Sequence, residues 1–227
     1  GTIPPMKVMV AIPWRAEPGR ELAHSLTLRH WAGVLPEAQV VDVDSGSELF
    51  SRAGSRNEAV RQAERAGAEV VVIGDADTLV DEVPLGLAIE GARTSGKVHL
   101  PYVVCRSLGA DGTAQYCEGV PLSECDAIPV YGSCGGIYVT TPSTWWAHGG
   151  QDERFRGWGF EDVAWVHAHV TLLGEPVRHE GNIYPLDHPV GAKEVPLLEA
   201  NYALLVRYEE AAGNPEAMRA LIAESAE

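Results

Sequence analysis

The chain of 227 residues lacks long apolar runs. No stretch approaches the 18 or more apolar residues of a membrane span, and the first residues have neither the basic nor the apolar region of a signal peptide. Apolar residues nevertheless make up 45% of the sequence, which is typical of a globular protein with a sizeable core. We therefore expect a cytosolic protein that has no membrane partner.

Positive charge is also scarce. The sequence has 17 lysines and arginines against 32 aspartates and glutamates, which gives a net charge of −15. It contains no basic stretch that could follow a phosphate backbone, so we do not expect tight nonspecific binding to duplex nucleic acid. Local basic pockets remain compatible with this composition.

Cysteine is rare, and the sequence has no Cys-X-X-Cys pair of the kind that binds structural zinc. The four cysteines are separated by 12, 8 and 9 positions and are Cys105, Cys117, Cys125 and Cys134. In a cytosolic chain we expect them to be reduced. A disulfide, or a zinc site completed by histidines, is the alternative.

The N-terminal half alternates predicted strands and helices. Strands are expected at Lys7–Ile12, at Val40–Val43 and from Val70, with helices at Pro18–Trp31 and Ser51–Ala66 between them. This βαβαβ order with right-handed crossovers predicts an α/β fold whose mostly parallel central sheet is flanked by helices. No Gly-X-Gly-X-X-Gly motif follows the first strand, which argues against a dinucleotide-binding site.

The second half of the chain is less regular. A helix at Val83–Thr94 and a strand at Val98–Val104 are expected to extend the sheet, and the segment Ser107–Pro129 is expected to be irregular. The other expected elements are a strand at Gly136–Thr140, a helix from Pro142, a helix at Glu161–Leu173, a strand at Asn182–Leu186, and two helices within Val195–Ala226 that break at Gly213–Pro215.

Two carboxylates follow the strand that starts at Val70. Its run of four apolar residues suits a central strand covered on both faces, and the chain then continues through Gly74 to Asp75 and Asp77. Ligands of open α/β sheets bind beyond the carboxyl ends of the strands. Two carboxylates there can share one Mg²⁺ or Mn²⁺ whose other ligands are waters and substrate phosphates. An ordinary turn is the alternative, because aspartate is common in turns.

Aromatic and cationic residues accompany this edge. After the first strand, Pro13 blocks immediate entry into a helix, and Trp14 and Arg15 present an aromatic ring and a cation. Arg52 and Arg56 lie one helical turn apart on one face, so both could reach toward a phosphate group. A solvated helix face is the alternative for this pair.

The densest group of polar residues and glycines spans residues 148–162. Glu161 and Asp162 begin a predicted helix, where acids are favoured by the helix dipole, so a structural role at the helix N-terminus is the alternative to a catalytic one. Farther along the chain, His179 and His188 flank the last predicted strand. Either imidazole could complete a metal shell.

Taken together, these motifs resemble the GT-A fold glycosyltransferases. The resemblance covers residues 6–190 and follows the order strand-Pro-Trp-Arg, Asp-rich second strand, Arg-bearing helix, Asp-X-Asp, Gly-Gly strand, Trp-Gly-Phe-Glu-Asp and downstream His. Residues 135–165 are similar to the galactosyltransferase-type segment of β-1,4-galactosyltransferases and polypeptide N-acetylgalactosaminyltransferases. The resemblance implies one GT-A domain over 1–227, with a nucleotide-sugar-binding half at 6–105, an acceptor and catalytic half at 106–190 and C-terminal helices at 191–227.

The resemblance also implies a role for each motif. Asp77 would ligate Mn²⁺ or Mg²⁺, and Asp75 would contact the metal or the donor ribose. His188 would be the third ligand, in preference to His179. Asp162 would be the catalytic base and Glu161 would orient the acceptor. The implied nucleotide-binding residues are Pro13, Trp14, Arg15, Asp42, Asp44, Arg52, Arg56 and Asn57. The implied sugar-binding residues are Gly135, Gly136, Trp158 and Gly159.

The implied activity is transfer of a hexose from a nucleotide-diphosphate sugar, with a UDP-sugar favoured, to an acceptor hydroxyl with inversion. The acceptor would be a protein, a glycan, a small aglycone or a modified nucleobase of phage DNA, although the acidic composition argues against the last. Without a stem, anchor or lectin domain, the resemblance implies a minimal bacterial or bacteriophage form in the cytosol of a bacterium or infected host. The alternatives are a sugar nucleotidyltransferase and a catalytically inactive GT-A-like binding module.

Overall fold

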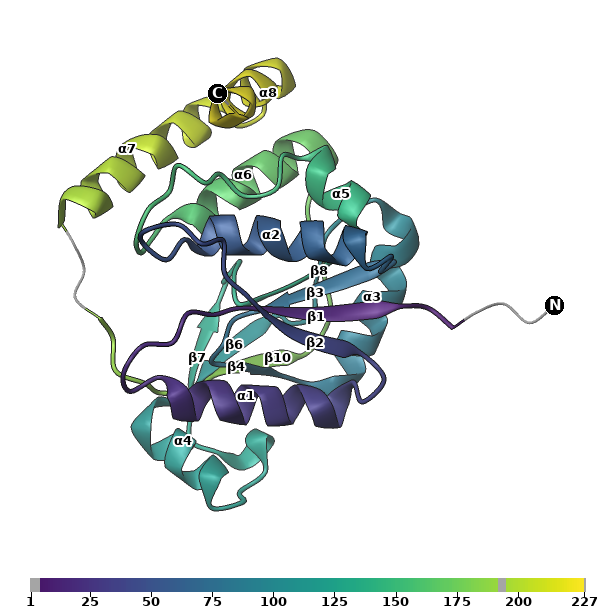
Figure 1. Ribbon diagram of the computed structural model, residues 1–227, viewed down its shortest axis with the longest axis vertical. Helices are drawn as coiled ribbons and strands as arrows, with labels where there is room; N and C mark the ends of the chain where they lie inside the picture. Colours follow the sequence, from purple (N-terminus) through teal and green to yellow (C-terminus); the bar gives the residue numbers. More distant parts are fainter. Residues whose placement is uncertain (1–4, 192–194, 227) are drawn as a thin grey trace.

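The computed structural model describes residues 5–191 and 195–226 and has two mixed sheets with helices around them (Figure 1). The larger sheet has the strand order β2-β1-β3-β8-β5-β9. Its strands are β1 (Val8–Pro13), β2 (Gln39–Val43), β3 (Val70–Gly74), β5 (His99–Leu100), β8 (Ile137–Thr140) and β9 (Val177–Arg178). The predicted α/β class is therefore confirmed.

The strand directions differ from a purely parallel sheet. The strand β1 pairs in parallel with β2 and β3, as the βαβαβ pattern predicts. The strand β8 runs antiparallel to both β3 and β5, so the sheet is mixed. Because β8 enters from the opposite end, the segment that precedes it, Gly135–Gly136, arrives beside the carboxyl end of β3, where the Asp75 amide donates to the Gly136 carbonyl at 2.8 Å.

Helices cover the larger sheet on both faces. Figure 1 shows α2, α5 and α6 on one side and α1 on the other. Ser51 and Thr141 cap α2 and α5 with their side chains, and Pro142 occupies the first turn of α5, so these helices begin where capping chemistry predicts. The bounds are α1 (Glu21–Val34), α2 (Arg52–Arg65), α3 (Glu82–Ser95), α5 (Pro142–Ala147) and α6 (Glu161–Leu173).

The smaller sheet corrects two expectations. Its order is β4-β10-β6-β7, with β4 (Thr78–Val80), β6 (Val104–Ser107), β7 (Ile128–Tyr131) and β10 (Asn182–Pro185). The single strand predicted at Val98–Val104 is wrong, because the chain divides at Pro101 into β5 and β6, which lie in different sheets. The segment predicted to be irregular contains α4 (Gly109–Cys117) and a short 3₁₀ turn, Leu122–Glu124.

The C-terminal helices pack on α6. They are α7 (Val195–Ala211) and α8 (Pro215–Ala223), followed by a short 3₁₀ turn at Glu224–Ala226. The predicted break is confirmed, because Asn214 caps α8 through its side chain. Leu205 is buried against α6, whereas Tyr202 is 55% exposed, so the apolar residues of α7 are only partly covered.

The main core lies around the larger sheet. All five residues of β3 are buried, as expected for a strand covered on both faces, and three tryptophans are fully or almost fully buried, Trp31, Trp145 and Trp165. The four cysteines are free. Within the described residues, no helix is both long and apolar enough to span a membrane.

Candidate active site

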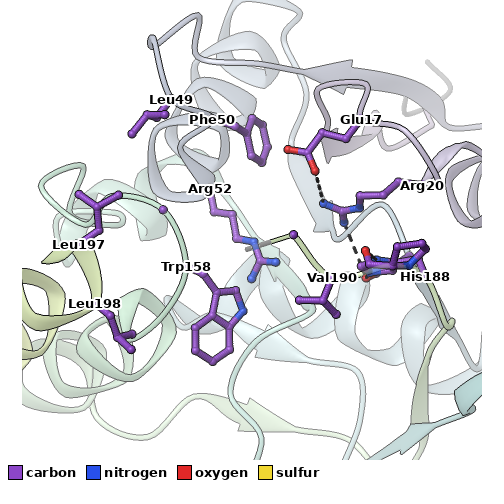
Figure 2. A pocket seen from close by; sticks show the side chains of 14 residues that line it. Glu17, Arg20, Leu49, Phe50, Arg52, Trp158, His188, Val190, Leu197 and Leu198 are labelled. Atoms are coloured by element: carbon purple, nitrogen blue, oxygen red, sulfur yellow. Dashed lines mark hydrogen bonds and ion pairs between the residues drawn. The ribbon is translucent and has the colours of Figure 1, made fainter. Parts of the chain in front are cut away.

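The predicted site residues converge at the carboxyl ends of β1, β2 and β3. Two cavities of about 500 and 650 Å³ meet there, and both are lined by Arg52, Asp77 and Trp158. Figure 2 shows Arg52 reaching into the first cavity between Phe50 and Trp158, with Arg20 and His188 beside it. The second cavity extends past Asp75 to Asp162. These two cavities form the candidate active-site cleft.

Asp77 and His188 form a close pair on the wall of the first cavity. The His188 Nε2 atom lies 2.7 Å from Asp77 Oδ2, because β10 pairs with β4 and so carries residues 186–188 back to the end of β3. The hydrogen bond to Asp77 raises the pKa of His188. His179 lies elsewhere, with its Nε2 atom 2.8 Å from Nδ1 of His99. The geometry therefore favours His188 over His179 beside the predicted metal ligand.

This pair fits a divalent cation in its chemistry. A carboxylate oxygen and an imidazole nitrogen are ligands that Mn²⁺ accepts, and both residues open onto the same cavity, where waters and phosphate oxygens could complete the shell. Within residues 5–191 and 195–226, no three His, Cys, Asp or Glu side chains come together as a metal-binding group. Asp75, which was predicted to contact the metal or the donor ribose, instead accepts from Arg56 Nη2 at 2.9 Å through Oδ1.

Arg56 lies deeper in the protein than its predicted role in nucleotide binding requires. Its side chain is fully buried and bridges two carboxylates, with Nη2 donating to Asp75 and Nη1 donating to Asp162 at 2.8 Å. The guanidinium also lies over the Tyr138 ring, 5.1 Å from its centroid. A group enclosed in this way cannot reach a phosphate in the cleft without breaking these bonds. Arg56 is therefore a structural cation beneath the site.

Asn57 also lies beneath the site. It is 3% exposed, its Nδ2 atom donates to the Gln151 carbonyl at 2.8 Å, and its Oδ1 atom accepts from Trp145 Nε1 at 3.0 Å. These bonds tie α2 to α5 and to the segment before α6. In this structure Asn57 therefore contacts protein groups in the interior, and its predicted role in nucleotide binding stays a prediction.

Asp162 stands at the inner end of the second cavity, in the first turn of α6. Its Oδ1 atom accepts from Arg56, from the Tyr138 hydroxyl and, at 3.5 Å, from Gln151 Nε2. Burial raises the pKa of Asp162, and the Arg56 cation offsets this only in part. An ionised carboxylate held in this way could accept a proton from a bound hydroxyl.

Gly135 explains how the chain can pass so close to Asp162. A Cβ atom on Gly135 would lie 2.5 Å from Asp162 Oδ2, so only glycine fits without movement of the carboxylate. The Tyr102 hydroxyl donates to the Gly135 carbonyl at 2.5 Å and holds this backbone in place. Gly136 follows with a φ of +87°, a conformation that favours glycine.

Arg15 holds a loop rather than pointing into the cleft. Its guanidinium donates to both oxygens of Asp44, at 2.6 and 2.8 Å, and to the carbonyls of Ser47 and Glu48 at 2.7 and 3.1 Å. The loop of residues 44–50 ends at Phe50, which lines the first cavity. The predicted residues Arg15 and Asp44 are thus brought together and fasten one wall of the site.

Trp14 and Asp42 meet at a third residue that the sequence did not single out, His24. The rings of Trp14 and His24 stack with centroids 4.0 Å apart, and His24 Nε2 lies 2.8 Å from Asp42 Oδ1. A small cavity beside this stack is lined by Pro13, Trp14 and Arg15 together with Asp75 and Asp77. The predicted nucleotide-binding residues at and after the end of β1 therefore adjoin the Asp-X-Asp segment.

Two arginines face the cleft. Arg52 is 31% exposed, and its nearest anionic partner is Glu161 at 3.6 Å. Arg20 lines the same cavity, where its Nη2 atom lies 4.0 Å from Asp77 Oδ2 and its buried Nε atom has no hydrogen-bond partner among the described residues. The two cations therefore flank Asp77. Arg20 was missed because its position at the start of a helix gave no sign of which way it points.

Trp158 stands where the two cavities meet. It is 48% exposed and lines both cavities, and the adjacent Gly159, at a φ of +110°, packs against Leu198 of α7. The residue before α6, Phe160, also has a positive φ of +73°. This tight loop projects an indole ring over the cleft, where it could stack on a sugar face.

Tyr138 and Gln151 are two further residues of the site that sequence reasoning missed. Side chains alternate along a strand, so Tyr138 lies on the same face as Gly136, and this alternation could have identified Tyr138 as a site residue. Gln151 lies in the dense polar segment, but nothing in its sequence context distinguishes it. Both residues are buried beneath the cleft.

No protein-family model matches the sequence, and no curated protein matches it. Among solved structures, β1,4-galactosyltransferase 7 from Drosophila, in complex with manganese, UDP-Gal and xylobiose, is 15% identical at a TM-score of 0.52, over 76% of this chain and 64% of that one. TarS from S. aureus in complex with UDP is 17% identical at a TM-score of 0.53, over 97% and 71%. This chain has the GT-A fold.

A third GT-A structure extends the likeness. GalNAc-T7 with UDP, GalNAc and Mn²⁺ is 12% identical at a TM-score of 0.55, over 93% of this chain and 51% of that one. The chain thus spans about two thirds of the galactosyltransferase and about half of GalNAc-T7. At these identities the likeness establishes the GT-A fold, which the resemblance in the sequence predicted.

Proposed function

We propose that the protein is a metal-dependent glycosyltransferase that uses a nucleotide-diphosphate sugar, with a UDP-sugar favoured. The observation that carries the proposal is the convergence of the Asp77–His188 pair, the Arg52 cation and the Asp162 carboxylate on one cleft at the carboxyl end of β3. The three solved structures described above, two of which contain Mn²⁺ or manganese and all of which contain UDP or UDP-Gal, support it.

The donor would lie along the first cavity. The base and ribose would adjoin Trp14 and Asp42, and the diphosphate would lie between Arg20 and Arg52, the two cations that flank Asp77. Asp77 and His188 would hold Mn²⁺ or Mg²⁺, which when bound supplies positive charge that stabilises the nucleotide as a leaving group. Arg56 has no place in this donor site.

The acceptor hydroxyl would lie beside Asp162 in the second cavity. Asp162 would take the hydroxyl proton as the acceptor oxygen attacks the anomeric carbon of the donor sugar, on the face opposite the phosphate. The bond between that carbon and the phosphate oxygen breaks, and its electrons leave with the nucleoside diphosphate, whose charge Arg52 and Arg20 stabilise. A single displacement of this kind inverts the configuration at the anomeric carbon.

Trp158 and Glu161 would shape the position of the sugar. Trp158 lies between the donor and acceptor cavities, and Glu161, 3.6 Å from Arg52 and 5% exposed, would fix the direction of that cation and of the acceptor. The acceptor would be a hydroxyl of a protein, a glycan or a modified nucleobase.

The proposal is tested by a thermal-shift panel of nucleoside diphosphates, each with and without Mn²⁺. A ligand that binds the native state raises the melting temperature by mass action. We expect one nucleotide series, that of UDP, to raise the melting temperature only when Mn²⁺ is present. Stabilisation by no nucleotide would contradict the proposal.

A further inference from the structure

The two oxygens of Asp162 have different surroundings. Three donors converge on Oδ1, namely Arg56 Nη1 at 2.8 Å, the Tyr138 hydroxyl, and Gln151 Nε2 at 3.5 Å. The other oxygen, Oδ2, faces the backbone of Gly135, where an added Cβ would lie 2.5 Å away, and both residues line the second cavity. The carboxylate is therefore held through Oδ1, while Oδ2 packs against Gly135 beside the second cavity.

We propose that Tyr138 is a positioning residue that fixes Oδ1 of Asp162 and leaves Oδ2 as the oxygen that receives the acceptor proton. This inference rests on the proposed function, since it assigns the orientation of the same base. Tyr138 does not touch the substrate in this account. It acts through Asp162.

The direction of the Tyr138 hydrogen bond follows from the groups behind it. Arg56 has only donors, so its bond to Gln151 at 3.0 Å fixes Oε1 as the acceptor and turns the amide nitrogen toward Tyr138. That nitrogen donates to the Tyr138 oxygen at 3.1 Å. Because its oxygen already accepts a bond, the hydroxyl proton of Tyr138 points to Asp162. The hydrogen bonds that run from Arg56 through Gln151 and Tyr138 to Asp162 therefore all donate in the same direction.

The ring of Tyr138 is held as firmly as its hydroxyl. It is fully buried, meets Trp145 and Trp165 edge-on at centroid distances of 5.8 and 4.9 Å, and lies beneath the Arg56 guanidinium. A phenylalanine would keep these contacts. Replacement of Tyr138 by Phe therefore keeps the ring contacts and removes only the hydroxyl, which donates to Asp162 and accepts from Gln151.

Several charged and titratable groups also face Asp162, from every element around it. They are Arg52 and Arg56 on α2, Asp75 after β3, Glu161 on α6, Cys134 before β8, and Tyr102. All of them remain in a Tyr138→Phe variant. Loss of the hydroxyl removes a bond that stabilises the ionised carboxylate, so the pKa of Asp162 should rise in that variant.

The test compares Tyr138→Phe with Tyr208→Phe. Tyr208 is a matched control, because its buried hydroxyl also donates to a carboxylate, Asp152 Oδ2 at 2.7 Å, away from the cleft.

The probes are UDP with Mn²⁺ for binding, and UDP-glucose, UDP-galactose and UDP-N-acetylglucosamine with water as acceptor for turnover, followed as UDP release. For Tyr138→Phe we expect unchanged UDP affinity, kcat lower by about tenfold, and an acid limb of the kcat profile at higher pH. Tyr208→Phe should change none of these.

A second readout does not need turnover. The carboxyl carbon of Asp162, labelled with ¹³C and followed by NMR, should titrate at higher pH in Tyr138→Phe than in the native protein, and at unchanged pH in Tyr208→Phe. If the native protein turns over no donor, the proposed function is at fault and the titration still decides this inference. An unchanged Asp162 titration in Tyr138→Phe, or a kcat equal to that of the native enzyme, would overturn it.

Discussion

At the scale of single residues, Arg52 and Arg56 show the limit of periodicity. Their spacing of four residues correctly places them on one helix face, and both face the site. The spacing does not say how deep each one lies. Arg52, in the first turn of α2, opens onto the cleft, whereas Arg56, one turn farther in, lies beneath β8 and α6 and is fully buried.

Alanine substitutions at the two positions should therefore affect different properties, UDP binding at Arg52 and stability at Arg56. Arg52→Ala should weaken UDP binding in the presence of Mn²⁺ by about tenfold, since it removes a charge-assisted contact, and should leave the melting temperature nearly unchanged. Arg56→Ala should lower the free energy of unfolding by about 3 kcal/mol, because Asp75 and Asp162 lose their buried counterion. Calorimetry and denaturant melts measure the two effects. Equal UDP affinities for Arg52→Ala and the native protein would contradict the proposed donor site.

At the scale of elements, local patterns predicted most of the structure that positions the site. Apolar runs and caps identified β1 to β3 and the helices between them, and Asp75 and Asp77 stand at the strand end where the sequence placed them. The splitting of the predicted strand at Pro101 and the helix α4 could not be predicted in the same way. Gly109 and Gly112 lower helix propensity in α4, and Gly112 is required because the Asp126 carbonyl packs against it.

The loop of residues 44–50 depends on Arg15 in a testable way. Arg15→Ala removes four hydrogen bonds to this loop, so amide hydrogen exchange of residues 45–50 should accelerate severalfold. The melting temperature should change little, because the pair with Asp44 is partly exposed. Arg65→Ala is the matched control, since it removes an exposed ion pair with Glu58 at 2.6 Å on the same domain. Unchanged exchange in Arg15→Ala would show that Arg15 does not hold the loop.

At the scale of the whole molecule, buried imidazoles should make the fold sensitive to acid. Burial lowers the pKa of His148 to about 3 and those of His99 and His169 to about 4, from the usual value of about 6.5 for histidine. Their partners favour the neutral form, because His148 accepts from Trp165 Nε1 and His169 accepts from the Val98 amide. No part of this cluster could be predicted from the sequence, in which the three histidines are far apart.

The sign of the effect follows from proton binding. Below pH 6.5 the unfolded chain binds protons at these histidines while the folded chain does not, so stability is retained above that pH and falls between pH 6.5 and about 3. His148 alone should cost about 2 kcal/mol at pH 5. The raised pKa of Asp162 acts in the opposite direction over part of this range. Denaturant melts from pH 7.5 to 5 measure the slope, and a constant free energy of unfolding would contradict this account.

The central claim is that the cleft binds a nucleoside diphosphate through a metal held at Asp77 and His188. The most direct measurement is calorimetric titration of the native protein and of Asp77→Ala with UDP, each with and without Mn²⁺. The account predicts binding by the native protein that requires Mn²⁺ and is lost in excess EDTA, and no Mn²⁺-dependent binding by Asp77→Ala. Equal UDP binding with and without Mn²⁺, or binding that survives in Asp77→Ala, would contradict it.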